Sequence, residues 1–366
     1  TGKSNIYLEN AQVKKGIPEF LKMKGREAAI ARMEILDELG SSVQKYFKKY
    51  PSGLEDGVNG WRKENKSRIL KYFKGEENDW NDYQWHLRKV IKDAKPLVEL
   101  IELTNEQREA VDNAVKNKIA FGITQYYLSL MDRKLSIGYD HAIRAQVIPP
   151  KEYVDKMVEH KGDRDITFDF MGEHDTSPIE LITRRYPIIS ILKPFNTCSQ
   201  ICVYCQRNWE IARVLEPKAL ASSKRIEEAL SWFDEHKSVG DILITGGDPL
   251  IMKDYQVERL LEAFASKKQV YRIRIGSRTP VVLPMRITDN LINIISKYHK
   301  PPKLEIAIVT HFEHSYEITP ESLNAVQKFK KIGVGVYNQQ VFTVENSRRF
   351  ETAKLRRDLK SIGVDP

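Results

Sequence analysis

The sequence predicts an α/β fold, namely a partial parallel barrel of the (β/α)6 type preceded by a helical N-terminal region. Three observations predict it. Short runs rich in Ile and Val recur after residue 187, helical stretches separate these runs, and the motifs that could carry chemistry come directly after them. Strand–helix alternation is typical of parallel strands with helical crossovers. In such folds the chemistry gathers at the C-terminal ends of the strands.

The chain has 366 residues, of which 41% are apolar and 30% charged. At roughly 150 residues per domain, this length predicts two or three units. The change of pattern along the chain divides it into a basic helical extension (residues 1–75), a second helical region (76–180) and the barrel (181–366).

Apolar residues recur at three- and four-residue spacing from about residue 17 to 132, which predicts helices. The clearest stretches are Ile17–Phe47, Trp80–Leu103 and Glu106–Met131. Asn78 or Asp79 is the expected N-cap of the second stretch. Residues 133–180, with scattered Gly, Pro and Asp, are expected to be largely irregular.

The barrel elements then alternate. Predicted strands are Ile188–Leu192, Asp241–Thr245, Tyr271–Gly276, Leu304–Val309 and Val334–Phe342, and predicted helices lie near 223–236, 254–266, 287–298, 320–331 and 348–361. The last helix is expected to lead into a further strand after Gly363, and the chain begins at Thr1 without a Met. We therefore expect it to be part of a longer polypeptide.

The net charge of +9 comes mainly from the first 75 residues, where 16 Lys and Arg against 9 Asp and Glu leave +7. A solvated helical surface explains this better than a nucleic-acid site. No apolar run approaches the roughly 18 residues of a membrane span, and the N-terminus has no signal-peptide pattern. We expect a cytoplasmic protein, and the apolar content excludes a disordered chain.

The only cysteines are Cys198, Cys202 and Cys205, within eight residues of one another. An odd, clustered set is not a disulfide framework and is more typical of metal or redox sites. Three thiolates can each ligate one iron of a cubane iron–sulfur cluster, leaving the fourth iron open to a small molecule. Zinc is the alternative, but structural zinc takes four ligands and no His lies nearby.

The second predicted strand ends in Thr245-Gly246-Gly247-Asp248-Pro249. Paired glycines let a backbone approach a ligand closely, and an acid beside them can meet an ammonium group. Gly-Gly-Asp-Pro also forms ordinary turns.

The C-x3-C-x2-C spacing, with Tyr204 before the last Cys, resembles the signature of the radical S-adenosylmethionine (SAM) superfamily. The resemblance implies a 4Fe–4S cluster whose open iron binds the methionine end of SAM. It also implies reductive cleavage to a 5′-deoxyadenosyl radical that takes hydrogen from the substrate. Gly246, Gly247 and Asp248 then resemble the motif that holds the amino end of SAM.

Further stretches resemble the lysine 2,3-aminomutases and their relatives that act on other amino acids. They are Trp80–Trp85, Ile123–Leu130, Arg184–Pro187, Arg272–Pro280, Pro284, Thr310-His311-Phe312 and Asn338-Gln339. The family resemblance implies pyridoxal phosphate as a second cofactor, with the nitrogen of an aldimine migrating from C2 to C3 of a free α-amino acid. It also implies an electron donor such as flavodoxin or ferredoxin, and a homo-oligomer is compatible with it.

Residue by residue, the resemblance implies that Arg207 binds the substrate carboxylate. It implies that Arg185 and Tyr186 lie beside pyridoxal phosphate. Tyr204, Ser277, Arg278, His311 and Gln339 are implied to lie near SAM or the substrate. A surface arginine is the alternative interpretation of Arg207, and a buried structural histidine is the alternative for His311.

Two departures from the family bear on the function. Ile189 stands where the family has another phosphate-side arginine, which favours an alternative: a related radical SAM enzyme without pyridoxal phosphate, acting on another substrate. Asn346-Ser347-Arg348-Arg349 replace an acid of lysine-specific relatives, so glutamate or another amino acid is at least as compatible as lysine. The family's Schiff-base lysine is expected beyond Pro366. A second alternative is a non-enzymatic iron–sulfur or zinc protein that binds a partner through its basic helices.

Overall fold

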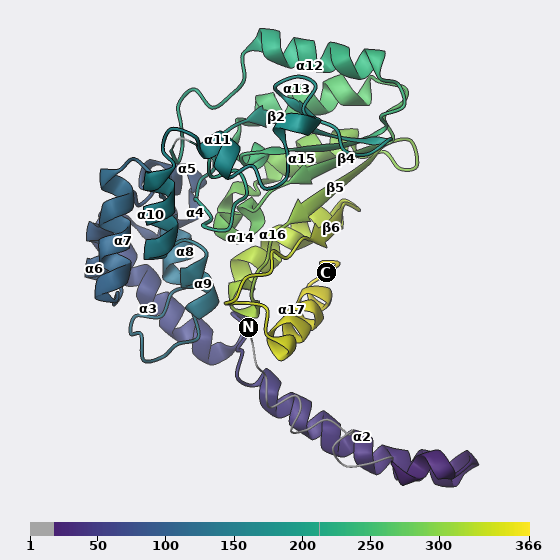
Figure 1. Ribbon diagram of the computed structural model, residues 1–366. Helices are drawn as coiled ribbons and strands as arrows, with labels where there is room; N and C mark the ends of the chain where they lie inside the picture. Colours follow the sequence, from purple (N-terminus) through teal and green to yellow (C-terminus); the bar gives the residue numbers. More distant parts are fainter. Residues whose placement is uncertain (1–17, 212) are drawn as a thin grey trace.

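A computed structural model describes residues 18–211 and 213–366. Within them, six strands form one sheet in the order in which they occur in the chain, with β1 antiparallel to β2 and all later neighbours parallel (Figure 1). The predicted α/β class is therefore confirmed. The strands are β1 (Ile182–Thr183), β2 (Ile189–Phe195), β3 (Asp241–Gly246), β4 (Arg272–Gly276), β5 (Glu305–Thr310) and β6 (Gly335–Asn338).

The parallel strands form where Ile and Val runs can be buried beside one another. Ile242, Ile273 and Ile306 are neighbours in register on three adjacent strands, and each is fully buried. Branched apolar side chains of this kind suit the pleated, covered surface of a parallel sheet. The predicted strands thus lie close to the observed ones. The last prediction extends too far, because the chain leaves β6 at Asn338, and the two-residue β1 was not predicted.

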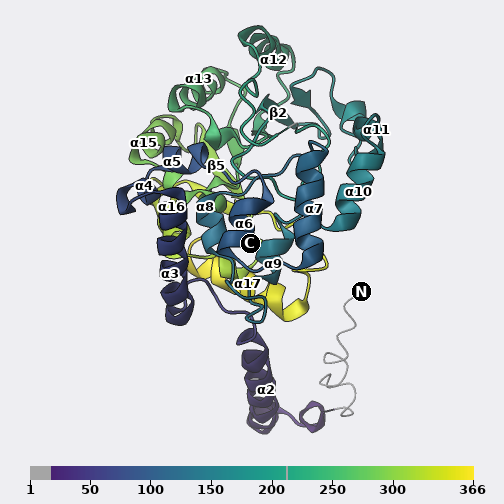
Figure 2. The ribbon, with the colours of Figure 1, turned by 90° about the vertical axis from the view of Figure 1, so that its left-hand side faces the viewer.

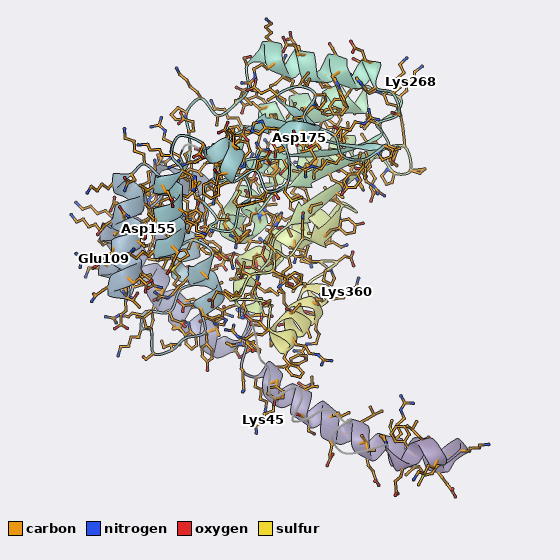
Figure 3. All side chains as sticks on the ribbon, viewed as in Figure 1. Lys45, Glu109, Asp155, Asp175, Lys268 and Lys360 are labelled. Carbon is orange, nitrogen blue, oxygen red and sulfur yellow. The ribbon has the colours of Figure 1, made fainter. Side chains whose placement is uncertain are left out.

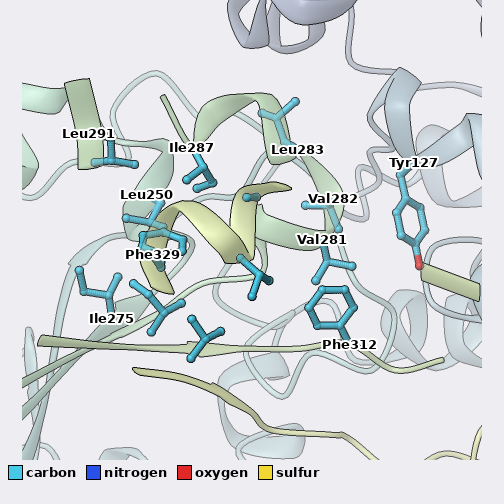
Figure 4. Close-up of a cluster of buried hydrophobic side chains, with 14 of the residues drawn as sticks. Tyr127, Leu250, Ile275, Val281, Val282, Leu283, Ile287, Leu291, Phe312 and Phe329 are labelled. Atoms are coloured by element: carbon cyan, nitrogen blue, oxygen red, sulfur yellow. The ribbon is translucent and has the colours of Figure 1, made fainter. Parts of the chain in front are cut away.

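Amphipathic crossover helices cover the outer face of the sheet (Figure 1). Figure 4 shows part of this core, in which Phe329 belongs to the same buried hydrophobic cluster as Leu250, Val281, Val282 and Ile287. Each predicted crossover helix is present. The helices are α12 (Ser223–Glu235), α13 (Asp254–Ala265), α14 (Thr279–Val282), α15 (Asp289–Tyr298), α16 (Pro320–Lys331) and α17 (Arg349–Ser361), with 3₁₀ turns η4 (Pro249–Ile251), η5 (Pro284–Arg286) and η6 (Ser315–Glu317).

The region before the sheet is helical, as predicted, but it is divided more finely. Its helices are α2 (Gly25–Phe47), α3 (Asp56–Phe73), α4 (Glu77–Asn81), α5 (Tyr83–Arg88), α6 (Ala94–Leu100), α7 (Asn105–Lys116), α8 (Gln125–Ser129), α9 (His141–Ala145), α10 (Lys151–Glu159) and α11 (Arg164–Thr167), with 3₁₀ turns η2 (Glu19–Lys22) and η3 (His174–Thr176).

Two predictions in this region are wrong. The N-cap of α4 is Glu76, not Asn78 or Asp79, because Glu76 and Asp79 form a reciprocal capping box. The stretch Trp80–Leu103 is three short helices, since Asp82 caps the start of α5 and Asp93 that of α6. Residues 133–180 are also less irregular than expected, because α10 buries Val154 and Met157 against α7.

Helix α2 projects away from the rest of the molecule in both ribbon views (Figures 1 and 2). It has no buried residue, and Figure 3 shows side chains on all sides of the projecting part of the helix. Its C-terminal end packs on the body, where Tyr46 stacks on Phe350 of α17 with ring centroids 4.5 Å apart. This agrees with a solvated helical surface for α2, whereas α3 of the same extension buries Val58, Ile69 and Leu70 in the core. Residues 1–17 of that extension lie outside the described residues. Among the described helices, none has both the length and the apolar character needed to cross a membrane.

The end of α17 leads back to the sheet. Asp365 forms a parallel bridge with Tyr337 of β6, through Asn338 N–H to Asp365 O at 2.7 Å and Asp365 N–H to Val336 O at 2.9 Å. Residues 364–365 therefore lie where the expected next parallel strand would begin.

Glu351 of α17 lies between two histidines. Its Oε1 is 3.2 Å from Nε2 of both His141 and His314, and the three side chains are close enough to suggest a metal site. However, His314 Nδ1 accepts the backbone N–H of Tyr316, so its Nε2 carries the proton and cannot ligate a metal. We interpret the group as a polar cluster, with His141 paired to Glu351 and His314 beside it, that fastens α17 to α9 and η6.

This cluster predicts a pH-dependent stability. Although burial opposes both shifts, the histidines hold the pKa of Glu351 at about 2, and Glu351 raises the pKa of His141. The depressed acid stabilises the fold above about pH 4.5 and loses this effect as the pH falls toward 2. The raised histidine stabilises it below about pH 6.5 and loses this effect as the pH rises through its folded value. Both contributions are therefore present near pH 5.5.

Replacing Glu351 by Gln should lower the free energy of unfolding by about 2 kcal/mol at pH 5.5, and by less at pH 8.5. Urea unfolding across this range measures the difference. Glu228→Gln is the matched control, since Glu228 is exposed and 3.9 Å from Lys224, and its effect should stay below about 0.5 kcal/mol. A pH-independent loss in the Glu351 variant would contradict the cluster interpretation.

Candidate active site

The predicted site residues on the barrel follow the C-terminal ends of five consecutive parallel strands. The cysteine loop follows β2, Gly247-Asp248 follow β3, Ser277-Arg278 follow β4, His311 follows β5 and Gln339 follows β6. Because the ends of parallel strands meet at one edge of the sheet, these loops converge. Their mutual hydrogen bonds, described below, hold them as one unit.

The Gly-Gly loop lies against the cysteine loop. Gly247 N–H donates to Phe195 O at 2.7 Å, and Asp248 N–H donates to Thr197 O at 2.9 Å. A Cβ atom on Gly247 would lie only 2.1 Å from the backbone oxygen of Thr197, and Gly246 has a φ of +114°. Both glycines are therefore needed for the two loops to touch.

The Asp248 carboxylate ties the loop after β3 to the loop after β4. It accepts the hydroxyls of Ser277 at 2.7 Å and Thr279 at 2.9 Å, and the backbone N–H of Arg278 at 3.0 Å. Burial raises the pKa of Asp248, while these hydrogen bonds oppose the rise. The carboxylate predicted to meet the ammonium of SAM is thus already engaged by this chain, and its direct contact with SAM stays a prediction.

Two of the half-buried thiols have an N–H donor nearby. Arg278 Nη1 lies 2.9 Å from Cys202 Sγ, and Arg207 N–H donates to Cys205 Sγ at 3.4 Å. Removal from water raises the pKa of Cys205 to about 11. A positive centre bound to Cys205 would favour its thiolate form.

Arg207 lies in a buried network of two cations and two carboxylates. Its guanidinium contacts both Glu173 and Glu210, and Lys193 of β2 contacts Glu173. Although burial acts in the opposite direction, Arg207 and Lys193 hold the pKa of Glu173 below its usual value. Arg207 is 7% exposed, so the structure does not support the surface-arginine alternative.

His311 and Glu313 add two more polar side chains to this edge. Removal from water and the Arg278 charge lower the pKa of His311 to about 4, so its ring is neutral at pH 7. Glu313 is fully buried, and its pKa is raised to about 8 by burial and by the nearby Glu317. Its Oε2 accepts Val341 N–H at 2.9 Å, and the carboxyl retains its proton at neutral pH.

Arg185 and Tyr186 lie just before β2, whereas the cysteine loop follows it. Arg185 Nε donates to Thr176 Oγ1 at 3.2 Å, and Tyr186 is 60% exposed. Their role beside pyridoxal phosphate stays a prediction.

Comparison with known proteins bears directly on this geometry. The model of the radical SAM superfamily matches residues 192–353. An uncharacterized KamA family protein of Methanocaldococcus jannaschii is 46% identical over 356 residues, covering 95% of this chain and 57% of the relative. Glutamate 2,3-aminomutase of Clostridioides difficile is 34% identical over 340 residues, covering 91% of this chain and 75% of the enzyme. L-lysine 2,3-aminomutase of Methanococcus maripaludis is 35% identical over 307 residues, covering 81% of this chain and 67% of the enzyme.

The chain belongs to the lysine 2,3-aminomutase family of radical SAM proteins. It spans 57% of the length of the M. jannaschii relative and 75% of the C. difficile enzyme.

For a member of this family, the thiols fit a 4Fe–4S cluster better than zinc. The loop supplies three thiols and contains no His, whereas a structural zinc takes four protein ligands. Three thiolates suffice for a 4Fe–4S cluster whose fourth iron stays open. Arg278 and the backbone N–H of Arg207 also lie within hydrogen-bond distance of the Cys202 and Cys205 sulfurs, and hydrogen bonds to the sulfurs are among the factors that tune iron–sulfur clusters.

Sequence reasoning missed three acidic residues of this aminomutase-family site. Glu173, Glu313 and Glu317 are all buried and contact predicted site residues or their neighbours. Glu313 could have been found, because it follows the end of β5 by three residues, where the strand-end rule already pointed to His311. Glu173 and Glu317 carry no such signal, since they come from a loop and a 3₁₀ turn outside the strand ends.

Replacing Gly247 by Ala should separate the two loops without unfolding the barrel, because the added methyl overlaps the Thr197 backbone. Loss of contacts that orient metal ligands typically lowers metal affinity about 10- to 100-fold, and we expect cluster retention to fall by a similar factor. Iron and sulfide analysis after anaerobic reconstitution measures it. Gly60→Ala in α3 is the control, since nothing lies within 4 Å of its added atom. Wild-type iron content in the Gly247 variant would contradict this role.

Proposed function

We propose that the chain is the radical SAM part of an isomerase that moves the amino group of a free α-amino acid from C2 to C3. The observation that carries the proposal is the position of the buried Arg207, two residues after Cys205, whose backbone N–H donates to the Cys205 sulfur at 3.4 Å. A planar guanidinium suits bidentate capture of a substrate carboxylate. The relatives named glutamate and L-lysine 2,3-aminomutase support the same reaction.

The ion-pair network suggests how Arg207 receives a carboxylate. Of its two partners, the Glu210 side chain is 32% exposed and the Glu173 side chain 10%. Glu173 is also bound to Lys193, so it stays in place more firmly than Glu210. We propose that the substrate carboxylate replaces Glu210 on Arg207, which keeps the charge of the network balanced.

Cys198, Cys202 and Cys205 would hold the cluster. When bound with SAM, a 4Fe–4S cluster supplies one-electron cleavage of the sulfonium and a 5′-deoxyadenosyl radical. The chain positions this chemistry through the Asp248 contacts to Ser277 and Thr279. We further propose a cytoplasmic setting and an electron carrier such as flavodoxin or ferredoxin as the reductant.

The substrate is lysine by family default, with glutamate or another amino acid at least as compatible. Arg348 no longer discriminates between them, because its guanidinium contacts Glu351 Oε2 at 3.4 Å and His141 Nε2 at 3.3 Å. We therefore base no choice of substrate on this arginine.

A related radical SAM enzyme without pyridoxal phosphate is the second candidate. Two observations favour it: Ile189 cannot pair with a phosphate, and the Nε of Arg185 already donates to Thr176 Oγ1 at 3.2 Å. The described residues thus fit pyridoxal phosphate less well than they fit the iron–sulfur cluster.

The full-length protein, reconstituted anaerobically with iron, sulfide, pyridoxal phosphate, SAM and dithionite, tests both candidates. Formation of a β-amino acid from lysine or glutamate, detected by chromatography and mass spectrometry, supports the mutase. An absorption band of enzyme-bound pyridoxal phosphate should accompany it. If 5′-deoxyadenosine forms but neither the band nor a β-amino acid does, the second candidate is supported. If no 5′-deoxyadenosine forms under any of these conditions, both fail.

A further inference from the structure

The Arg278 guanidinium contacts a thiol, although the resemblance implied only a position near SAM or the substrate. Nη1 lies 2.9 Å from Cys202 Sγ. Nη2 lies 2.6 Å from Glu317 Oε1 and also donates to Gln146, and Nε donates to His311 O at 3.2 Å. The side chain is 9% exposed. All three nitrogens of the guanidinium therefore have acceptors within the protein, and one of these acceptors is sulfur.

The fold holds this guanidinium from several sides. The backbone N–H of Arg278 is fixed by the Asp248 carboxylate at 3.0 Å. The rings of Tyr127 and Tyr204 lie 5.3 and 5.5 Å from its central carbon, within the range of cation–π attraction. Rotation of Arg278 away from Cys202 would have to break these contacts, so the N–H···S geometry is built into the site.

Glu317 is held just as firmly. Besides Arg278, its carboxylate accepts the Tyr127 hydroxyl at 2.7 Å and the backbone N–H of Glu313 at 2.6 Å. These donors and the Arg278 guanidinium engage both oxygens of the carboxylate. The pair therefore places a positive group in contact with the thiol and a negative group directly behind it.

This arrangement has a consequence for a cluster bound through Cys202. A neutral thiol is a weak hydrogen-bond acceptor, whereas a thiolate bound to iron is negative and accepts a charged N–H strongly. Hydrogen bonds to the sulfurs and the local charge are among the factors that set the reduction potential of iron–sulfur clusters. Reduction adds one electron, and hence one negative charge, which a nearby cation favours.

We propose that Arg278, through its N–H···S bond to Cys202, raises the reduction potential of the cluster, and that Glu317 limits this effect. Arg278 is thus a positioning residue for electron entry: one electron passes from an external one-electron reductant to the cluster, with no proton transfer. The inference rests on the cluster of the proposed function. It is independent of the amino acid used and of pyridoxal phosphate.

An EPR-monitored redox titration of the reconstituted full-length protein, without SAM, tests this inference. In Arg278→Gln the ratio of reduced to oxidised cluster at a fixed potential should fall about tenfold. This corresponds to a midpoint potential lower by about 59 mV for a one-electron couple. Arg278→Lys keeps the positive charge but loses the planar set of N–H donors, so its ratio should lie between those of the wild type and Arg278→Gln. Glu317→Gln should shift the ratio in the opposite direction, and Arg278→Gln with Glu317→Gln should lie nearer the wild type.

Arg274→Gln is the matched control. Arg274 lies on β4, the strand that leads to Arg278, but its Nε donates to Asp241 at 2.8 Å, and Asp241 is the first residue of β3, at the opposite end from the cysteine loop. Its titration should match the wild type. A shift in Arg274→Gln equal to that in Arg278→Gln would overturn the inference, because the effect would then not depend on contact with Cys202.

Unchanged potentials in Arg278→Gln and Glu317→Gln, at wild-type iron and sulfide content, would also overturn it. If Arg278→Gln fails to hold a cluster, Arg278→Lys and Glu317→Gln decide: shifts of opposite sign support the inference, and wild-type potentials in both overturn it. Failure of the proposed function looks different, because the wild-type chain would then form no 4Fe–4S cluster and give no reduced signal to titrate.

Discussion

Replacing Cys202 by Ala will abolish the formation of 5′-deoxyadenosine from SAM. Only three thiols are present in the chain, and each is needed to hold one iron of the cluster while the fourth stays open. Loss of contacts that merely orient metal ligands already lowers metal affinity or activity about 10- to 100-fold. Loss of a ligand itself should therefore reduce the amount of 5′-deoxyadenosine by more than about 100-fold. Anaerobic reconstitution, iron analysis and chromatographic detection of 5′-deoxyadenosine provide the measurement.

Val203→Ala is the matched control for this variant. Val203 is the next residue, half-buried, and contributes a backbone N–H to Gln146 O at 2.7 Å that the substitution preserves. It should retain the cluster and the activity. If Cys202→Ala still produced 5′-deoxyadenosine at the rate of Val203→Ala, the radical SAM chemistry could not depend on this thiol trio, and the proposed function would fail.

Replacing Arg207 by Ala will weaken use of the amino acid while sparing cleavage of SAM without substrate. Loss of a charge-assisted carboxylate contact costs on the order of 2–3 kcal/mol, or roughly 30- to 150-fold in kcat/KM. The fold should survive, because Glu173 keeps Lys193 as a partner. Steady-state kinetics with the identified amino acid, together with the rate of 5′-deoxyadenosine formation in its absence, measures both effects.

Two further variants sharpen this test. Arg213→Ala is the control, since Arg213 lies on the same loop but is exposed and paired with Glu216 at 2.6 Å. It should leave kcat/KM unchanged. Glu210→Gln should lower KM, because it removes the carboxylate that we propose the substrate replaces. Wild-type kinetics in Arg207→Ala would show that this arginine does not bind the substrate. An unchanged KM in Glu210→Gln would contradict the proposal that the substrate carboxylate replaces Glu210.

The strand-end chemistry could be predicted in large part from sequence. The β3 motif Thr245–Pro249 and the thiol loop were expected to follow adjacent strands, and the structure joins them through Gly247 and Asp248. This works because Ile- and Val-rich runs of strand length identify parallel strands, and the ends of such strands converge by topology. No knowledge of side-chain contacts is needed for that step.

The boundaries of the N-terminal helices could not be predicted as well. Periodicity alone joined Trp80–Leu103, whereas Asp82 and Asp93 end one helix and begin the next by capping. The apolar pattern continues across such caps, since burial on one face does not require one continuous helix. Helix α10 was missed because its short apolar face, Val154 and Met157, lies among residues typical of loops.

The sequence by itself determined the ligand types, their spacing and the strands that carry them, because these depend on local pattern. Only the tertiary structure decided which charges meet. Arg207 binds Glu173 from 34 residues away, and Arg278 reaches Cys202 across 76 and Glu317 across 39. Such pairings depend on where separate loops arrive in space, which no local periodicity encodes. They are nevertheless strong, because burial removes the water that would otherwise screen them.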